Sequence, residues 1–214
     1  MEIWKDWGFE WEFVWCGVGS RETPKEIIPV MVWVGQSLAL LGGVLATGDA
    51  TGSDTHFFDG YNLGRLPKMP PAQVYYTRKK NQRNLEHSPQ MGQHEFEMYP
   101  EVGHIAQDMA YEARGSFEGL FPSGIALHSR NALQVLSETL DNPRRFTVYY
   151  AKPVGKRGAV AGGTNTAVKI SRKNKIPTVN LYVEEQRTKF IEWVTKQLTD
   201  RNITVPTIIG EPNV

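Results

Sequence analysis

The hydrophobic pattern of this chain alternates between short apolar runs and longer segments with helical spacing. Five short runs, rich in β-branched and aromatic residues, are predicted to be strands: residues 12–16, 44–47, 72–76, 146–151 and 176–181. Between them, apolar residues recur every three or four positions, as on one face of a helix. Strands that alternate with helices predict an α/β fold, with a doubly wound, mostly parallel Rossmann-like sheet and helices on both faces.

The longer segments predict six helices. They cover residues 23–41, 55–63, 105–114, 125–140, 162–174 and 184–198. The first would begin at Thr23 and Pro24, because a hydroxyl cap followed by proline is a common helix start. Gly42 would end it, since glycine readily adopts the conformation found just after a helix. This helix and its two flanking strands would form a right-handed βαβ unit.

Length and polarity define the expected domain organisation. A chain of 214 residues with 40% hydrophobic residues suits one core rather than two. We therefore expect a single domain over residues 1–214. The stretch 77–103 is polar with few periodic apolar positions, and the loop 115–124 is rich in Phe and Gly. These features predict an insertion or lid at residues 77–124.

Four tryptophans near the N-terminus are spaced by three and four residues: Trp4, Trp7, Trp11 and Trp15. On a helix they would share one face. Such a stripe either packs over the edge of the sheet or forms a platform on which nucleic-acid bases stack. The sequence supports both interpretations.

Charge and cysteine content narrow the classes of function. The 24 basic and 23 acidic residues give a formal net charge of +1, which argues against a dedicated duplex-DNA binder. The single Cys16 excludes an intramolecular disulfide and a cysteine-based zinc site, and is interpreted as a buried, inert thiol. The sequence has neither an apolar run of membrane-helix length nor a signal-peptide pattern. We expect a cytoplasmic protein with no membrane partner, no metal and no cofactor.

Three glycine-rich loops stand between predicted strands and helices, at residues 17–21, 47–54 and 162–167. Loops at the carboxyl ends of neighbouring parallel strands line one crevice. Glycine lets the backbone approach a ligand closely, and the free N–H groups at a helix start favour an anion. The loops therefore predict one site for a nucleotide-like small molecule that carries a phosphate.

The order and spacing of four motifs resemble those of the SLOG superfamily, which includes the SMF/DprA and LOG proteins. The motifs are Gly17-Val-Gly-Ser-Arg21, Thr47-Gly-Asp-Ala-Thr-Gly-Ser-Asp54, Arg130-Asn131 and Gly162-Gly-Thr-Asn-Thr-Ala167. The resemblance covers residues 12–182 and is closest to the DprA-like branch. It implies a Rossmann-like fold with a crevice for nucleotide phosphate.

Two positions depart from the patterns of the superfamily. LOG-type phosphoribohydrolases carry a glutamate after the third glycine loop, where residues 162–169 of this chain have no acid. In the DprA-like branch, an arginine stands where this chain has Thr51. The first departure removes the acid expected of a nucleotide N-glycosidase, and the second weakens a DNA-binding interpretation.

The resemblance assigns ligand-binding residues position by position. They are Gly17, Gly19, Ser20, Arg21, Gly48, Asp49, Thr51, Gly52, Asp54, Arg130, Asn131, Gly162, Gly163, Thr164, Asn165 and Thr166. Backbone N–H groups of Gly19 and Ser20 would approach phosphate or ribose, as would those of Gly163 and Thr164. Arg21 and Arg130 could supply bidentate contacts to a phosphate.

Several of these residues also have a structural interpretation. Arg130 either binds the ligand or caps a neighbouring helix. Asp49 either contacts the ligand or caps its own loop. Asp54 is expected to stabilise the second loop, because an acid in the first turn of a helix offsets the positive end of the helix dipole.

Three functions fit these features. The first is a sensor or sequestering protein that binds a nucleotide-derived ligand. The second is a nucleotide N-glycosidase or a ribosyl or deoxyribosyl transferase, with Asp49 and Arg130 as catalytic candidates and Glu95, Glu97 and Asp108 as further acids. The third is a DprA-like protein that binds single-stranded DNA through the cluster 78–83 together with Lys152, Lys156 and Arg157. Whether the protein is an enzyme stays open.

Other classes fit poorly. The first loop lacks the third glycine of a dinucleotide-binding fingerprint, and the chain has no nucleophile-elbow motif of a triad hydrolase. Because relatives commonly associate through helices that flank the sheet, the resemblance also implies a homo-oligomer.

Overall fold

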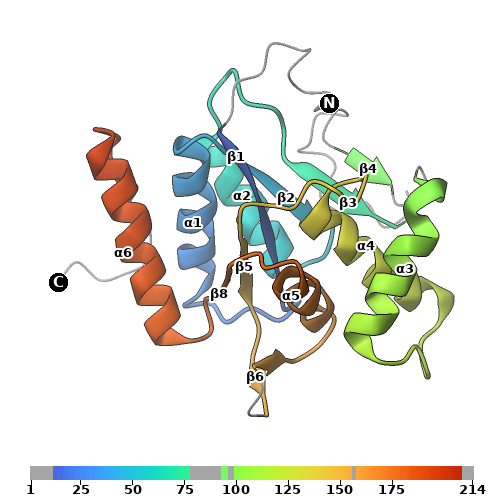
Figure 1. The fold of residues 1–214 in the computed structure, drawn as a ribbon. Helices are drawn as coiled ribbons and strands as arrows, with labels where there is room; N and C mark the ends of the chain where they lie inside the picture. Colours follow the sequence, from blue (N-terminus) through green and yellow to red (C-terminus); the bar gives the residue numbers. More distant parts are fainter. Residues whose placement is uncertain (1–11, 78–92, 96–98, 156–157, 209–214) are drawn as a thin grey trace.

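The computed structural model describes residues 12–77, 93–95, 99–155 and 158–208 (Figure 1). Its centre is a six-stranded parallel sheet with the order β4-β3-β2-β1-β5-β8. The strands are β1 (Phe13–Gly19), β2 (Gly43–Gly48), β3 (Gln73–Tyr76), β4 (Gln93–Glu95), β5 (Thr147–Tyr150) and β8 (Thr178–Asn180). The predicted doubly wound, Rossmann-like sheet is confirmed.

The chain builds this sheet in two directions from β1. It first adds β2, β3 and β4 on one side, then returns to add β5 and β8 on the other. Cys16 of β1 therefore pairs with Ala46 of β2 on one side and with Thr147 of β5 on the other. The order reverses between β1 and β5, and in open α/β sheets ligands bind at the carboxyl ends of the strands at this switch point.

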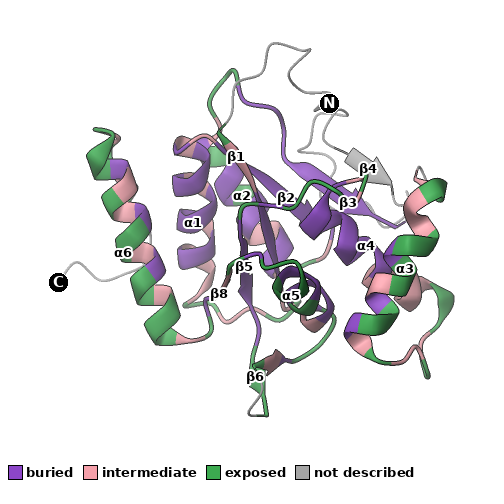
Figure 2. Cartoon of the chain, viewed as in Figure 1, coloured by how far each residue is buried: buried purple, intermediate pink, exposed green. Residues whose placement is uncertain are grey.

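Helices cover both faces of the sheet (Figure 1). One face carries α1 (Ile28–Leu40), α2 (Ser53–Gly64) and α6 (Glu184–Asp200), and the other carries α3 (Pro100–Arg114), α4 (Pro122–Leu136) and α5 (Thr164–Lys173). Because successive strand residues point to opposite faces, Trp15 enters the core under α1 and Cys16 enters the core under α4 and α5. Burial is deepest in the sheet and α1, whereas α6 and α3 expose their outer faces (Figure 2).

Glycines allow α1 and α2 to pack backbone to backbone. A Cβ at Gly60 would collide with the carbonyl of Val32, and one at Gly64 would collide with the carbonyl of Gln36. The short separation explains why most of α1 is buried between α2, α6 and the sheet.

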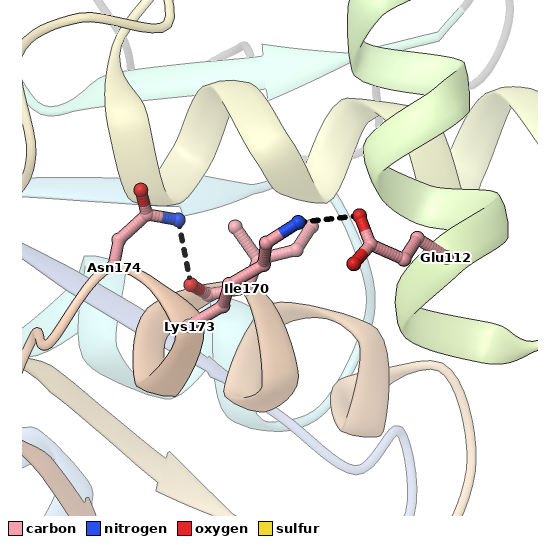
Figure 3. A network of polar contacts seen from close by, with 4 residues as sticks. All are labelled: Glu112, Ile170, Lys173 and Asn174. Atoms are coloured by element: carbon pink, nitrogen blue, oxygen red, sulfur yellow. Dashed lines mark hydrogen bonds and ion pairs between the residues drawn. The ribbon is translucent and has the colours of Figure 1, made fainter.

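On the opposite face, α5 is joined to α3 at its C-terminal end (Figure 3). The ammonium of Lys173 lies 2.5 Å from Oε2 of Glu112, and both side chains are largely exposed. Asn174 Nδ2 donates to the carbonyl of Ile170 at 2.9 Å and so satisfies one of the last carbonyls of the helix. An exposed ion pair contributes little stability, so α3 is held mainly by buried alanines such as Ala106 and Ala110.

The helix bounds differ from the prediction at two places. α1 begins at Ile28 rather than Thr23, because Pro29 has no N–H to donate back to the preceding turn and its ring would clash there. α4 runs from Pro122 to Leu136, earlier than predicted at both ends. Its end is set by Ser137, which has a φ of 79°.

Two other segments contain strands that the sequence did not predict. The polar stretch predicted as an insertion contains β4, which pairs in parallel with β3. The segment after β5, for which no strand was predicted, contains a hairpin of β6 (Pro153–Val154) and β7 (Ala159–Val160). The assignment of residues 77–124 as an insertion or lid stays a prediction, since residues 78–92 and 96–98 lie outside the described part of the chain.

Trp15 and Cys16 lie in β1 with the buried positions expected of strand residues, so the interpretation that places Trp15 on the face of a helix is wrong. Trp15 is fully buried and packs edge-on against Phe57, with ring centroids 5.6 Å apart. Cys16 is free and buried, and burial raises the pKa of its thiol to about 12, which disfavours the reactive thiolate. Trp4, Trp7 and Trp11 lie outside the described residues. Within the described residues, no helix combines the length and apolar character that crossing a membrane requires.

The helix contact predicts the outcome of a pair of glycine substitutions. Gly60→Ala should destabilise the protein by about 1–3 kcal/mol, because overpacking at Val32 outweighs the gain of about 1 kcal/mol in helix propensity. Gly124→Ala in α4 is the matched control, since its Cβ would only make an ordinary contact with Leu120. Urea unfolding should show Gly124→Ala unchanged or more stable. Equal effects of both substitutions would contradict close packing of α1 and α2.

Candidate functional site

A pocket of about 700 Å³ opens at the carboxyl ends of β1 and β5, where the strand order reverses. Its lining comes from the first and third glycine loops, the start of α2, one face of α4 and the loops after β5 and β8. The lining includes Gly19, Ser20, Arg21, Glu22, Ala50, Asp54, Leu127, His128, Arg130, Asn131, Gln134, Tyr150, Lys152, Gly162, Gly163, Thr164 and Tyr182.

The first loop is fixed between β5 and the start of α2. The N–H of Ser20 donates to the carbonyl of Tyr150 at 2.8 Å. The carbonyl of Ser20 in turn accepts from the N–H and the hydroxyl of Ser53, both at 3.0 Å. The N–H of Ser20 is therefore engaged within the protein, whereas the exposed side chain of Arg21 lies at the pocket.

Arg130 brings a buried positive charge to the floor of the pocket. Its Nη1 donates to the carbonyl of Tyr75, at the end of β3, at 3.0 Å. The side chain crosses the end of β2 so closely that a Cβ at Gly48 would overlap both its guanidinium and the carboxylate of Asp54. Glycine at position 48 is thus required by the Arg130 and Asp54 side chains, and Gly48 does not itself line the pocket.

Asp54 supplies the opposing charge. It is 3% exposed, and its Oδ2 accepts from the N–H of Ala50 at 3.4 Å. Burial raises the pKa of Asp54 to about 6, although the positive charge of Arg130 and the Ala50 hydrogen bond lower it. Burial likewise lowers the pKa of Arg130, while the charges of Asp54 and Asp49 raise it. The opposite charge of Arg130 therefore offsets only part of the cost of burying the Asp54 carboxylate.

Three polar atoms at the pocket floor have no hydrogen-bond partner among the described residues. They are Nε of Arg130 and both the Nε2 and Oε1 atoms of Gln134, whose side chain is fully buried. Buried polar groups are nearly always hydrogen-bonded, so unsatisfied atoms beside a pocket are unusual. Their position suits a polar ligand with both donors and acceptors.

The third loop presents the start of α5 to the pocket. Gly163 is the N-cap residue and has a φ of −64°, and a Cβ there would make only an ordinary contact with His128. Asn131 braces the loop by donating from Nδ2 to the carbonyl of Gly163 at 3.2 Å. None of the hydrogen bonds between described residues uses the N–H of Gly163 or Thr164. These donors are the anion-binding feature expected of a helix N-terminus.

Other polar residues of this loop have structural partners. Oδ1 of Asn165 accepts from the N–H of Val160 at 3.1 Å. The hydroxyl of Thr166 lies 2.7 Å from Nδ1 of His128, which ties α5 to α4. Burial, then the charges of Arg114 and Arg130, lowers the pKa of His128, which favours the neutral imidazole.

The structure divides the sequence-predicted site residues into two groups. Those that line the pocket are Gly19, Ser20, Arg21, Asp54, Arg130, Asn131, Gly162, Gly163 and Thr164. Those that do not are Gly17, Gly48, Asp49, Thr51, Gly52, Asn165 and Thr166. Asp54 rather than Asp49 is therefore the second-loop carboxylate at the pocket, and Thr51 is an exposed loop residue.

Sequence reasoning did not assign several polar and aromatic pocket residues to the site, among them His128, Gln134, Tyr150 and Tyr182, and it named Lys152 only as a candidate contact for single-stranded DNA. A local signal existed for some of them. His128 and Gln134 share the helical face of Asn131, and Lys152 directly follows the predicted strand 146–151. Tyr182 had no such signal, because its position depends on how the loop after β8 packs.

Several predicted candidates remain outside the described site. The cluster 78–83, Lys156, Arg157 and Glu97 lie outside the described residues. Asp108 is exposed on α3 and does not line the pocket. In the part of the chain that the structure describes, no three His, Cys, Asp or Glu side chains are grouped to hold a metal ion.

Fold and site together define a Rossmann-like α/β protein with a pocket at its topological switch point. A solved structure of DNA processing protein A from Helicobacter pylori, reported for its single-stranded DNA binding mode, has a similar fold. Its TM-score is 0.51 at 14% identity, and the match covers 88% of this chain and 81% of that one. No family model and no curated protein matches the chain. The match shows a shared fold, and SLOG membership stays a prediction.

The buried carboxyl predicts a pH dependence of stability. Because folding raises the pKa of Asp54 from 3.8 to about 6, the folded state holds this proton more tightly than the unfolded state. The stabilisation is complete below about pH 4 and is lost as the pH rises through 6. Relative to Asp54→Asn, the wild type should lose roughly 2 kcal/mol between pH 4 and pH 7, at 1.36 kcal/mol per pKa unit, because part of the loss has already occurred at pH 4.

Urea unfolding of both proteins at each pH measures this difference, and the other titrating groups cancel in the comparison. A stability difference that stays constant from pH 4 to pH 7 would show that Asp54 titrates normally.

Proposed function

We propose that the chain binds a nucleotide-derived ligand in the switch-point pocket and holds its phosphate at the start of α5. The observation that carries this proposal is the convergence of two kinds of donor around one cavity: the N–H groups of Gly163 and Thr164, which have no hydrogen-bond partner among the described residues, and the cations Arg21 and Arg130. Helix N–H groups and guanidinium groups both bind phosphate through charge-assisted hydrogen bonds. The volume of about 700 Å³ suits a ligand of nucleotide size.

The unsatisfied polar atoms support the same proposal. A phosphate alone offers only acceptors, whereas the carboxamide of Gln134 has both a donor and an acceptor without partners among the described residues. A sugar hydroxyl or a base edge, directly or through water, could satisfy both.

Binding of mononucleotides tests this proposal through Arg21. Thymidine 5′-monophosphate should bind the wild type at least tenfold more tightly than thymidine in titration calorimetry, because only the former carries the phosphate. Arg21→Ala should remove about tenfold of the monophosphate affinity, the equivalent of about 1.4 kcal/mol. Arg21 is exposed, so its loss should leave thermal stability nearly unchanged.

Arg145→Ala is the matched control. Arg145 is also exposed but precedes β5, at the opposite end of the strand from the pocket. Equal affinity for thymidine and its monophosphate, or equal loss in both arginine variants, would contradict a phosphate site in this pocket.

Single-stranded DNA is the second candidate ligand, and the fold match favours it, since the Helicobacter pylori protein is described as binding single strands. Lys152, Arg21 and Arg130 would contact phosphates at the pocket. Affinity for oligothymidylates that rises with length and falls steeply with salt would favour a strand. An affinity that does not increase from the mononucleotide to longer oligothymidylates would favour the small-molecule ligand.

Cleavage of the N-glycosidic bond is a further alternative. Such chemistry needs a carboxylate near the developing positive charge on the sugar. Asp54 is the buried carboxylate at the pocket, but the N–H of Ala50 and the charge of Arg130 engage it at the floor. Release of free base by the wild type and not by Asp54→Asn would establish this activity.

A further inference from the structure

Two tyrosines form an aromatic wall of the pocket. Tyr150 ends β5 and Tyr182 follows β8, and their ring centroids lie 5.5 Å apart with planes tilted by 48°. Tyr150 is 7% exposed, whereas Tyr182 is 40% exposed, and both line the cavity. The inner ring thus packs in the core while the outer ring is accessible from the pocket.

The two walls of the pocket belong to opposite faces of the sheet. Tyr150 packs in the core under α1 and α6. Arg130, Asn131 and the start of α5 lie on the face covered by α3, α4 and α5. A ligand in the pocket would therefore cross the ends of β1 and β5, with charge recognition on one side and aromatic surface on the other.

A buried asparagine fixes the position of Tyr182. Asn180 is 2% exposed, and its Oδ1 accepts from the N–H of Tyr182 at 3.1 Å and from the N–H of Ala151 at 3.2 Å. Its Nδ2 donates to the carbonyl of Ala151 at 2.8 Å. Arg187 adds a hydrogen bond from Nη1 to the carbonyl of Leu181 at 2.8 Å. The loop after β8 is thereby bonded to the end of β5, and the aromatic surface is preorganised.

We propose that Tyr182, supported by Tyr150, stacks against the base of the nucleotide whose phosphate lies at the start of α5. Stacking on an accessible tyrosine tolerates any base, because every base has a π face. This inference rests on the proposed function and adds a contact to the base, which is the part of the ligand that the phosphate site does not bind. The expected ligand is a free nucleotide or one nucleotide within a single strand, rather than a sugar phosphate without a base.

Substitution of Tyr182 tests the stacking. Titration calorimetry with thymidine 5′-monophosphate and with 2-deoxyribose 5-phosphate separates the base from the phosphate. Tyr182→Ala should weaken monophosphate binding about tenfold and leave binding of the sugar phosphate unchanged. Tyr182→Phe should retain wild-type affinity within about twofold, since it keeps the ring.

Tyr111→Ala is the control, because Tyr111 is 53% exposed on α3 and does not line the pocket. Unchanged monophosphate affinity in Tyr182→Ala, with sugar phosphate still bound, would overturn the stacking and leave the phosphate site intact. Equal losses in the Phe and Ala variants would also overturn it, since they would assign the effect to the hydroxyl. Failure of the wild type to bind either compound would overturn the phosphate site and the stacking together.

Discussion

The burial of one guanidinium, that of Arg130, determines much of the geometry beneath the pocket. A buried cation needs an opposing charge and hydrogen bonds, because leaving water costs it several kcal/mol. Asp54 supplies the charge from α2, and the carbonyl of Tyr75 at the end of β3 accepts a hydrogen bond. Gly48 leaves room for both side chains at the end of β2. One side chain of α4 thus connects three other elements at the pocket floor.

The reversal of strand order adds the second constraint. β1 and β5 are neighbours in the sheet but far apart in the chain, so the loops at their ends diverge to opposite faces and leave a cavity. Helix α5 brings the N–H groups of its N-terminus to one face. The loops after β5 and β8 bring Tyr150 and Tyr182 to the other. The proposed recognition of a phosphate and of a base would therefore depend on the topology as well as on residue type.

Much of the fold could be predicted from the sequence, because the signals are local. Alternation places Trp15 and Cys16 in opposite cores, and the glycines of the first and third loops mark strand and helix ends. The rest depends on tertiary contacts. β4 is three polar residues that become a strand only through pairing with β3, and Pro29 moves the start of α1. The pocket role of Tyr182 requires the Asn180 hydrogen bonds that position its loop.

The most direct test of the phosphate site is an amide-resolved NMR titration with thymidine 5′-monophosphate. The N–H resonances of Gly163 and Thr164 should shift progressively and by the largest amounts, because these donors would bind the phosphate. Those of Arg145 and Thr178, at the amino ends of β5 and β8, should stay in place. Saturable shifts centred elsewhere, with Gly163 and Thr164 unmoved, would contradict a phosphate site at the start of α5.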